Sequence, residues 1–342
     1  MKKNTNLHTA KKEKNDEFYT LYEDIDNELQ HYKQHFNNKI VYCNCDDPDK
    51  SQFVQYFINN FQNLCLQKLI TTSYNKKGTY FEYNGVSIKK GNLVGNGDFR
   101  SEECLEILQN CDIVVTNPPF SLFREFIKCM CQYNKHFLVL GNSNAVTYKE
   151  IFPLIKSNQL WLGATLFCGK MPYFKVPDDY EITNDRIIIN DKGERLKQVN
   201  SIAWFTNLVH DKCNKPLTLT KQYNSMDYPQ YDNYNAIEVS KTKDIPMDYD
   251  GVMGVPITFL DKFDPNQFEI VGFTESFDKN DDIENIRTHD KMRNRAYING
   301  KRLYARILIK RKHKPEEIDD IKQENSMNEM VNRLVKNYFK NN

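Results

Sequence analysis

Four consecutive residues, Asn117-Pro118-Pro119-Phe120, combine groups that suit the capture of a planar amine. The Asn117 side-chain carbonyl and the Pro118 backbone carbonyl can both accept hydrogen bonds from one exocyclic amino group. The two prolines fix the backbone, so these acceptors are preorganised. Phe120 offers a face on which a planar base can stack. An amine whose two protons are both held turns its lone pair toward an electrophile, so the pattern indicates group transfer to a nucleobase nitrogen.

The flanking residues place this corner at the end of a buried strand. Residues 112–116 are β-branched and apolar and predict a short strand in a sheet core. Neither proline can continue a ladder, because each lacks an N–H, so the strand must stop at Asn117. Residues 121–133 then predict a helix, with Ser121 available as its N-cap. A strand, a rigid turn and a helix bring polar groups into the crevice of an α/β sheet.

This segment resembles motif IV of the amino-methyltransferases, the [D/N/S]-P-P-[Y/F/W] signature of enzymes that methylate N6 of adenine or N4 of cytosine. The alternative is a Pro-Pro turn that only caps a helix. The preceding strand, the following helix and the terminal Phe favour the methyltransferase. The resemblance implies that the catalytic residues are Asn117, Pro118, Pro119 and Phe120, and the NPPF form favours adenine over cytosine.

Length and composition limit the other classes of protein. The 342 residues suffice for one large α/β domain and a smaller one, and a net charge of +1 neither requires nor excludes a polyanionic partner. The N-terminal segment is charged and unlike a signal peptide, and no window is apolar enough to cross a bilayer. Nine cysteines without C-x-x-C spacing favour a reducing compartment and no metal site. We therefore expect a soluble, cytoplasmic protein without a membrane partner.

Strands alternating with helices predict a parallel sheet in the first two-thirds of the chain. Among these elements we expect helices at 24–36, 52–64 and 148–157, and a strand pair near 187–189 and 202–205. Asn84-Gly85 and Asn299-Gly300 are typical of hairpin turns. We divide the chain into a flexible N-terminus (1–16), a catalytic domain (17–213), and a connecting region with a β-rich module (214–342). In that module strands are expected at 257–260 and 268–273, and a charged helix beyond 315.

The segment 301–314 holds seven Lys or Arg residues and no acid, interleaved with apolar residues. One face would pack on a core and the other would contact phosphates. Read alone, a solvated basic edge strand is an equal alternative. The demand for nucleic acid elsewhere in the chain favours phosphate contact.

From Asn15-Asp16-Glu17-Phe18 to the stretch ending at Ile309, the chain resembles the EcoRI-type adenine-specific DNA methyltransferase family. The resemblance implies a Rossmann-like sheet, S-adenosylmethionine as cofactor, double-stranded DNA as substrate, and extrusion of the target adenine into the site. It leaves open whether a cognate restriction endonuclease is encoded nearby and whether the protein is a monomer or a dimer. Rival functions are N-methylation of RNA or of a protein glutamine, and a catalytically silent DNA-binding module.

The same resemblance assigns cofactor-binding roles, each with a structural alternative. Phe18, Tyr19 and Thr20 resemble motif X, which folds over the methionine end of the cofactor; the alternative is a turn with a helix cap at Thr20. Asp98, followed by Phe99, would accept from the cofactor adenine, or only start a turn. Phe123 would contact that adenine, or lie in the core.

The loop after the first strand has no glycine, which departs from the usual cofactor-binding turn. In it Asp46 or Asp47 would bind the amino-acid end of the cofactor, or else serve only to cap the 52–64 helix. No acid is assigned to the ribose, and Glu82 is a distant candidate. We expect the DNA contacts to come from Trp204, Lys301, Arg302, Arg306, Lys310 and Arg311, although a core position is also open for Trp204.

Overall fold

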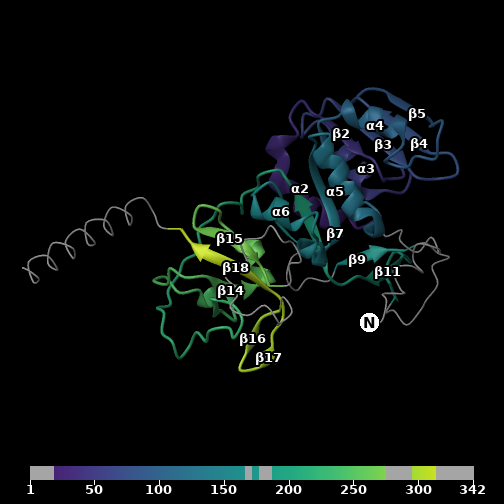
Figure 1. Cartoon of the computed structure of the whole chain (residues 1–342). Coiled ribbons are helices and arrows are strands. Elements are labelled where there is room, and N and C mark those ends of the chain that lie inside the picture. The colour runs from purple at the N-terminus through teal and green to yellow at the C-terminus, as the bar shows by residue number, and fades with distance from the viewer. Residues whose placement is uncertain (1–18, 166–171, 177–186, 275–294, 313–342) are drawn as a thin grey trace, which may run out of the picture. The chain divides into compact units, whose positions relative to one another are not determined.

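The computed structural model describes residues 19–165, 172–176, 187–274 and 295–312. By its internal contacts the chain divides into two compact units, Met1–Cys213 and Asn214–Asn342. The first unit is a mixed α/β structure built on a large sheet, and the second is dominated by short strands (Figure 1). Phe18 and the segment beyond 315 lie outside the described residues. No helix in the described ranges is long and apolar enough to span a bilayer.

The large sheet of the first unit has eight strands in the order β5-β4-β3-β2-β6-β7-β12-β8. Its four central strands run parallel: β3 (Lys68–Ser73), β2 (Ile40–Cys43), β6 (Ile113–Thr116) and β7 (His136–Asn142). The other strands are β4 (Thr79–Tyr83), β5 (Ile88–Asn92), β12 (Ile202–Thr206) and β8 (Trp161–Leu162).

The prediction of a parallel sheet is therefore correct only for the centre of the sheet. The strands β4, β5 and β12 each pair antiparallel with their neighbours. A short connection of residues 74–78 joins β3 to β4, which allows only antiparallel pairing, because a parallel crossover needs a dozen residues or more. Residues 113–116 of the predicted strand 112–116 do form a central strand, β6.

The helices of this unit expose polar residues and bury aromatic ones. Helix α3 (Gln52–Asn59) begins at the N-cap Ser51 and buries Phe53, Tyr56 and Phe57. The predicted first helix is α2 (Tyr22–Leu29) continued by the 3-10 turn η1 (Gln30–His35). The remaining elements are α4 (Glu102–Gln109), η2 (Phe120–Leu122), α5 (Phe123–Gln132), η3 (Ser143–Thr147) and α6 (Phe152–Lys156). The predicted helix at 148–157 is shorter, because Pro153 occupies its first turn and favours a helix start there.

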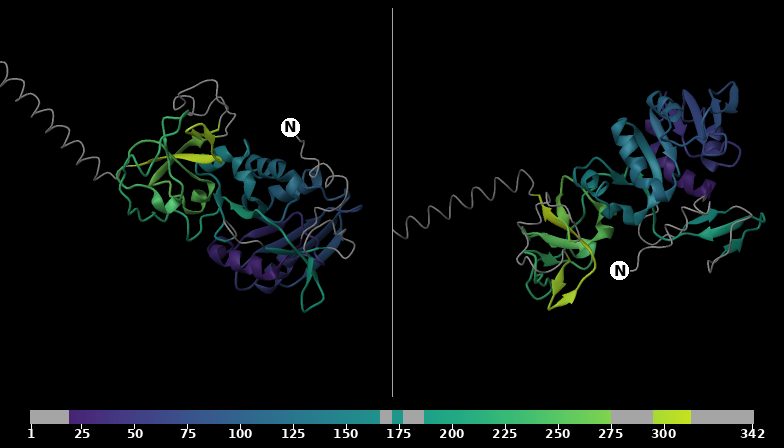
Figure 2. Two further views of the ribbon diagram at one scale, coloured as in Figure 1. Left: turned by 90° about the horizontal axis from the view of Figure 1, so that it is seen from below. Right: turned by 45° about the vertical axis from the view of Figure 1, so that its right-hand side comes forward.

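A second, four-stranded sheet of the first unit has the order β1-β9-β11-β10. It consists of β1 (Tyr19–Thr20), β9 (Tyr173–Lys175), β11 (Arg195–Gln198) and β10 (Ile187–Ile189). In both views of Figure 2 the teal strands of this sheet project as a ribbon from the body of the unit. The two strands expected near 187–189 and 202–205 are both present, but they belong to different sheets, because β10 pairs with β11 and β12 pairs with β7 in the large sheet.

The second unit has a sheet in the order β13-β14-β18-β15 and a separate hairpin, β16-β17. The strands are β13 (Ile237–Glu238), β14 (Met253–Pro256), β15 (Phe268–Phe273), β16 (Tyr297–Ile298), β17 (Lys301–Arg302) and β18 (Arg306–Arg311). The hairpin turn at Asn299-Gly300 is confirmed, with positive φ at both residues. The strand predicted at 257–260 is instead part of a 3-10 helix, η5 (Ile257–Lys262), which buries the adjacent Phe259 and Leu260. A short 3-10 turn, η4 (Thr242–Asp244), lies in the irregular region before it.

Candidate active site

The order of the central strands creates a place where polar groups gather. From β2 the chain moves outward to β3, and it later returns to β6 on the other side of β2. At such a reversal the connections leave the sheet in opposite directions, so a crevice opens at the carboxyl ends of the two strands. Residues 44–51 follow β2, and the Asn117 corner follows β6.

Asp46 joins the two sides of this reversal. Its carboxylate accepts from the Ser51 hydroxyl at 2.6 Å and from the Thr116 hydroxyl at 2.5 Å. Its backbone N–H donates to the Thr72 carbonyl at the end of β3, at 3.0 Å. Burial raises the pKa of Asp46 to about 6, although the two hydroxyl donors oppose this shift. Both side-chain partners described for this buried carboxylate are neutral hydroxyls.

The alternative role of Asp46 and Asp47, capping the helix that follows, belongs instead to Ser51. Ser51 is the N-cap of α3 and accepts from the Phe53 N–H at 3.1 Å. Asp47 accepts from the Asp49 N–H at 2.9 Å and so closes a local turn. The described bonds of the Asp46 carboxylate go to hydroxyls and not to the helix N–H groups, which leaves its charge available for another role.

The Asn117 corner lies where the sequence predicted, directly after a central strand. Pro118 is buried, and neither proline bond is cis. The Asn117 amide nitrogen donates to the Thr20 hydroxyl of β1 at 3.4 Å. This contact joins two segments that are 97 residues apart. Thr20 does not cap α2, because the N-cap of α2 is Leu21 and carries no side-chain cap.

The step from the corner into the helix differs from the prediction. Phe120 begins the 3-10 turn η2 and packs with its half-buried ring against the main core. The Leu122 N–H donates to the Pro119 carbonyl at 2.9 Å, so the diproline corner closes this turn itself. Ser121 therefore lies within η2, and the N-cap of α5 is Leu122 without a side-chain cap.

Asp98 lies in the loop between β5 and α4, which approaches the end of β3. A β-carbon on the preceding Gly97 would collide with the Ser73 carbonyl oxygen, so only glycine fits this approach. The Asp98 carboxylate accepts from the Arg100 backbone N–H at 2.9 Å and is paired with the Arg100 guanidinium, at 2.9 and 2.7 Å. The hydrogen bonds from Arg100 lower the pKa of Asp98. Asp98 thus starts a turn, and it also keeps an accessible carboxylate at this edge of the sheet.

The aromatic residues predicted beside the cofactor are packed against protein. Phe99 is buried with its ring centroid 5.1 Å from that of Phe126. Phe123 is buried 5.0 Å from Phe205, and it covers Gly141, where a β-carbon would approach its ring to 2.5 Å. Both rings therefore contribute to the core, and either could reach a ligand only through an edge or through its backbone.

Comparison with known proteins decides the family. A family model described as adenine-specific methyltransferase EcoRI matches residues 6–87 and 81–312, which is most of the chain. The chain belongs to this family. It is 48% identical to the type II methyltransferase M.EcoRI of Escherichia coli over 328 residues, which cover 90% of this chain and 96% of that protein.

Two mycoplasma relatives support the same conclusion. The chain is 42% identical to the type II methyltransferase M.MgeORF184P of Mycoplasma genitalium over 319 residues, covering 88% of this chain and 97% of the relative. It is 40% identical to M.MpnI of Mycoplasma pneumoniae over 320 residues, covering 89% and 97%. No solved structure matches the chain. This member of the EcoRI adenine methyltransferase family is therefore a methyltransferase enzyme.

The residues predicted to bind DNA differ in their surroundings. Trp204 is fully buried in β12, with its ring centroid 5.9 Å from that of Phe53, so the structure gives it the core position. Arg306 pairs with Glu238 at 2.6 Å, with both side chains largely buried. Arg311 lies 3.3 Å from Asp250. Lys301, Arg302 and Lys310 are exposed.

Sequence reasoning missed the two hydroxyls that hold Asp46 in this family member. Thr116 was treated only as the last residue of a strand, and Ser51 only as part of a loop. The signal for Ser51 was its position before an apolar helix, which is typical of an N-cap. No local signal links Thr116 to Asp46, because the two lie 70 residues apart.

Proposed function

We propose that this chain transfers the methyl group of S-adenosylmethionine to N6 of an adenine in double-stranded DNA. The observation that carries the proposal is the junction of three segments at one edge of the large sheet. Asn117 follows β6, Asp46 follows β2 and contacts Thr116, and Thr20 comes from β1 to contact Asn117. We also infer a Rossmann-like sheet, since the cofactor-binding and catalytic segments adjoin at a reversal of strand order.

Asp46 fits the amino-acid end of the cofactor. That end carries an ammonium group, which is a strong partner for a carboxylate whose described partners are neutral hydroxyls. Asp98 fits the adenine end, because its pairing with the half-exposed Arg100 is weak in water and can be exchanged for a ligand donor. Tyr19 and Thr20 then lie on the strand that covers the methionine end, and Asp47, Phe99 and Phe123 support the pocket.

Asn117 and Pro118 position the target amine. The contact between the Asn117 amide and the Thr20 hydroxyl limits the rotation of the Asn117 side chain. The Asn117 and Pro118 carbonyl oxygens accept the two N6 protons and direct the nitrogen lone pair. When bound, the cofactor supplies an electrophilic methyl carbon on a sulfonium sulfur. Most of the rate enhancement then comes from holding the amine in line with that carbon.

A paired adenine hides its amino group, so the base must leave the duplex to reach Asn117. Phe120 supplies the stacking face for the extruded base, since its ring is half-buried and immediately follows the diproline corner. Trp204 is assigned to the core behind the sheet and not to the base.

The second unit offers a basic hairpin for the DNA backbone. The hairpin turn is clamped by Asp232, whose carboxylate accepts from the Asn299 N–H at 3.0 Å and from the Gly300 N–H at 2.8 Å. Lys301 and Arg302 are exposed on this hairpin, and the adjacent Tyr304 side chain is 87% exposed. Rigid exposed cations suit phosphates, and an exposed ring suits a base or sugar. Lys310 is a further exposed cation, on β18, whereas Arg306 and Arg311 are paired with Glu238 and Asp250.

Modified-base sequencing of DNA from cells that express the chain tests the chemistry and the target together. We expect N6-methyladenine at one defined sequence, and its absence from cells that express Asn117→Ala. N4-methylcytosine, methylated RNA, or unmodified DNA from cells with abundant folded protein would each contradict the proposal.

A further inference from the structure

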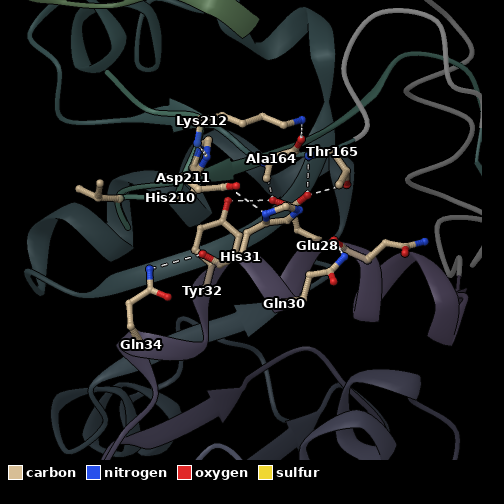
Figure 3. Close-up of polar contacts among 12 residues, drawn as sticks. Glu28, Gln30, His31, Tyr32, Gln34, Ala164, Thr165, His210, Asp211 and Lys212 are labelled. Carbon is tan, nitrogen blue, oxygen red and sulfur yellow. Dashed lines mark hydrogen bonds and ion pairs between the residues drawn. The ribbon is translucent and has the colours of Figure 1, made fainter. Parts of the chain in front are cut away.

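The Glu28 carboxylate, near the end of α2, lies at the centre of four hydrogen bonds (Figure 3). Its Oε1 accepts from the Tyr32 hydroxyl at 2.8 Å and from the Ala164 N–H at 2.7 Å. Its Oε2 accepts from the Thr165 N–H at 2.7 Å and from the Thr165 hydroxyl at 2.5 Å. Glu28 therefore binds two consecutive backbone amides of a segment that is 136 residues away in sequence.

A buried carboxylate is unfavourable at this position unless its hydrogen bonds to Tyr32, Ala164 and Thr165 offset the cost of burying it. Glu28 is fully buried, which disfavours its charged form and raises its pKa. It also lies in the last turn of α2, where the helix dipole disfavours a negative charge. An apolar side chain of similar size would avoid both costs, so filling space does not account for a glutamate here.

The segment bound by Glu28 is held closely on both sides. A β-carbon on Gly163 would collide with Glu28 Oε1 and with Trp204 Cβ, so the backbone rests directly on these two side chains. On the other side, the Lys212 ammonium donates to the Ala164 carbonyl (Figure 3). A His210 ring nitrogen lies 2.9 Å from the Leu162 carbonyl oxygen. Segment 162–165 is thus fixed against α2 and the core.

Both partners of this contact continue along the chain to the same ribbon. Strand β1 ends at Thr20, immediately before α2, and β9 follows segment 162–165. The two strands pair with each other, Tyr19 with Lys175 and Thr20 with Phe174. Thr20 in turn accepts from Asn117. The Glu28 contact and the β1–β9 pairing therefore join the same two stretches of the chain, and β1 contacts the catalytic corner through Thr20.

We propose that Glu28 is a positioning residue for methyl transfer: by fixing Ala164 and Thr165, it holds the β1–β9 ribbon over the cofactor's methionine end. The inference rests on the proposed function, in which Tyr19 and Thr20 cover that end. It predicts that a change at Glu28 acts on cofactor binding first, although Glu28 itself touches no reactant.

The test compares three variants of the full chain with the wild type. Glu28→Gln keeps the shape but turns an amide N–H toward donors, and Thr165→Val removes one of the four donors. Thr206→Val is the matched control, because the buried Thr206 hydroxyl donates to the Phe137 carbonyl at 2.7 Å in the large sheet. For each variant we would measure Tm, the Kd for radiolabelled S-adenosylmethionine, and separate KM values for cofactor and DNA.

For Glu28→Gln we expect the Kd and KM for S-adenosylmethionine to rise about tenfold or more, with the KM for DNA within about twofold of the wild type. Thr165→Val should show a smaller rise, and Thr206→Val should lower Tm without changing cofactor affinity. If Glu28→Gln does not fold, the rise in Thr165→Val alone decides. Unchanged cofactor affinity in the folded variants would overturn the role of Glu28. A wild-type chain that binds no S-adenosylmethionine would instead overturn the proposed function.

Discussion

Two buried carboxylates, Asp46 in the first unit and Glu238 in the second, show how different partners give similar groups different roles. Glu238 binds the Arg306 guanidinium at 2.6 and 3.0 Å and accepts from the Tyr231 hydroxyl. Its negative charge is neutralised within the protein. Asp46 accepts only hydroxyl hydrogen bonds among its described side-chain contacts, so its negative charge has no cation beside it. The Asp46 carboxylate is solvated by hydroxyls but not neutralised, and it lies at the reversal of strand order, so it is suited to a cationic ligand, whereas the neutralised Glu238 holds the fold together.

The largest expected effect concerns Asn117, which follows Thr116, the residue whose hydroxyl binds Asp46. Asn117→Ala removes one of two acceptors for the N6 protons, and we expect methyl transfer to fall about 100- to 1000-fold. Cofactor binding should stay within about twofold, because Asp46 and Thr116 are unchanged. Single-turnover methylation and equilibrium binding of the cofactor measure the two effects. Asn60→Ala, at the C-cap of α3, is the control and should retain its rate; full turnover in Asn117→Ala would disprove the mechanism.

The second prediction tests whether the Glu238 pair is structural. Arg306→Gln leaves Glu238 buried without a cation, so the free energy of unfolding should fall on the order of 3 kcal/mol. The double variant Glu238→Gln/Arg306→Gln should recover much of this loss, because no unpaired charge remains. Urea unfolding measures both. If Arg306→Gln has normal stability but binds DNA more weakly, Arg306 contacts DNA, as predicted from the sequence.

The third prediction tests whether Asp46, unlike Glu238, binds S-adenosylmethionine. Asp46→Asn keeps the size of the side chain but removes its charge. A hydrogen bond to a charged group contributes about 1.5–3 kcal/mol, so the Kd for S-adenosylmethionine should rise about 10- to 100-fold. Asp112→Asn is the control, because that carboxylate accepts from the Ile40 N–H at 2.8 Å before β6 begins, at the opposite edge of the sheet. Equal cofactor affinity in the two variants would remove Asp46 from the site.

The pH dependence of stability tests the same carboxylate. Burial raises the pKa of Asp46 from 3.8 to about 6 in the folded chain. Its stabilising contribution is therefore full below about pH 4 and is lost as the pH rises toward 6, because the unfolded chain ionises first. Relative to the wild type, Asp46→Asn should gain on the order of 2 kcal/mol of stability between these pH values and nothing more above them. Urea unfolding at about pH 4.5 and about pH 7 measures the difference, and an equal difference at both would be inconsistent with this titration.

The smallest effects are expected on the hairpin of the second unit. Lys301→Gln or Arg302→Gln should weaken DNA binding a few-fold, and each should lower the salt dependence by about one counterion if its side chain neutralises one phosphate. Lys312→Gln is the control, because the Lys312 ammonium donates to the Pro265 carbonyl at 2.8 Å. Fluorescence anisotropy with duplex DNA at several salt concentrations gives the slopes. Identical slopes for all three variants would exclude the hairpin from the interface.

The sequence predicted those features that depend on neighbouring residues. The strand before Asn117 and the turn at Asn299-Gly300 are set by β-branched runs, prolines and residues that tolerate positive φ, and both are present. The run at 257–260 was read wrongly as a strand, because so short an apolar run carries too little periodicity to distinguish a strand from a 3-10 turn.

The features that sequence could not supply depend on contacts between distant segments. The direction of β12 in the sheet is set by pairing with β7, which lies far earlier in the chain. The neutral surroundings of Asp46 and the neutralised state of Arg306 follow from partners 70 and 68 residues away. In the sequence alone, Asp46 and Arg306 are equally good candidates for a ligand contact. Only their contacts in the folded chain distinguish them.

The clamp between Asp232 and the β16–β17 turn has a practical consequence for engineering. Because this carboxylate binds backbone amides, it holds the turn whatever side chains follow it. Positions 301, 302 and 304 could therefore be randomised together in a library while the loop keeps its shape. Selecting such a library for binding to duplex DNA would show which side chains on the hairpin strengthen the proposed contact with the DNA backbone.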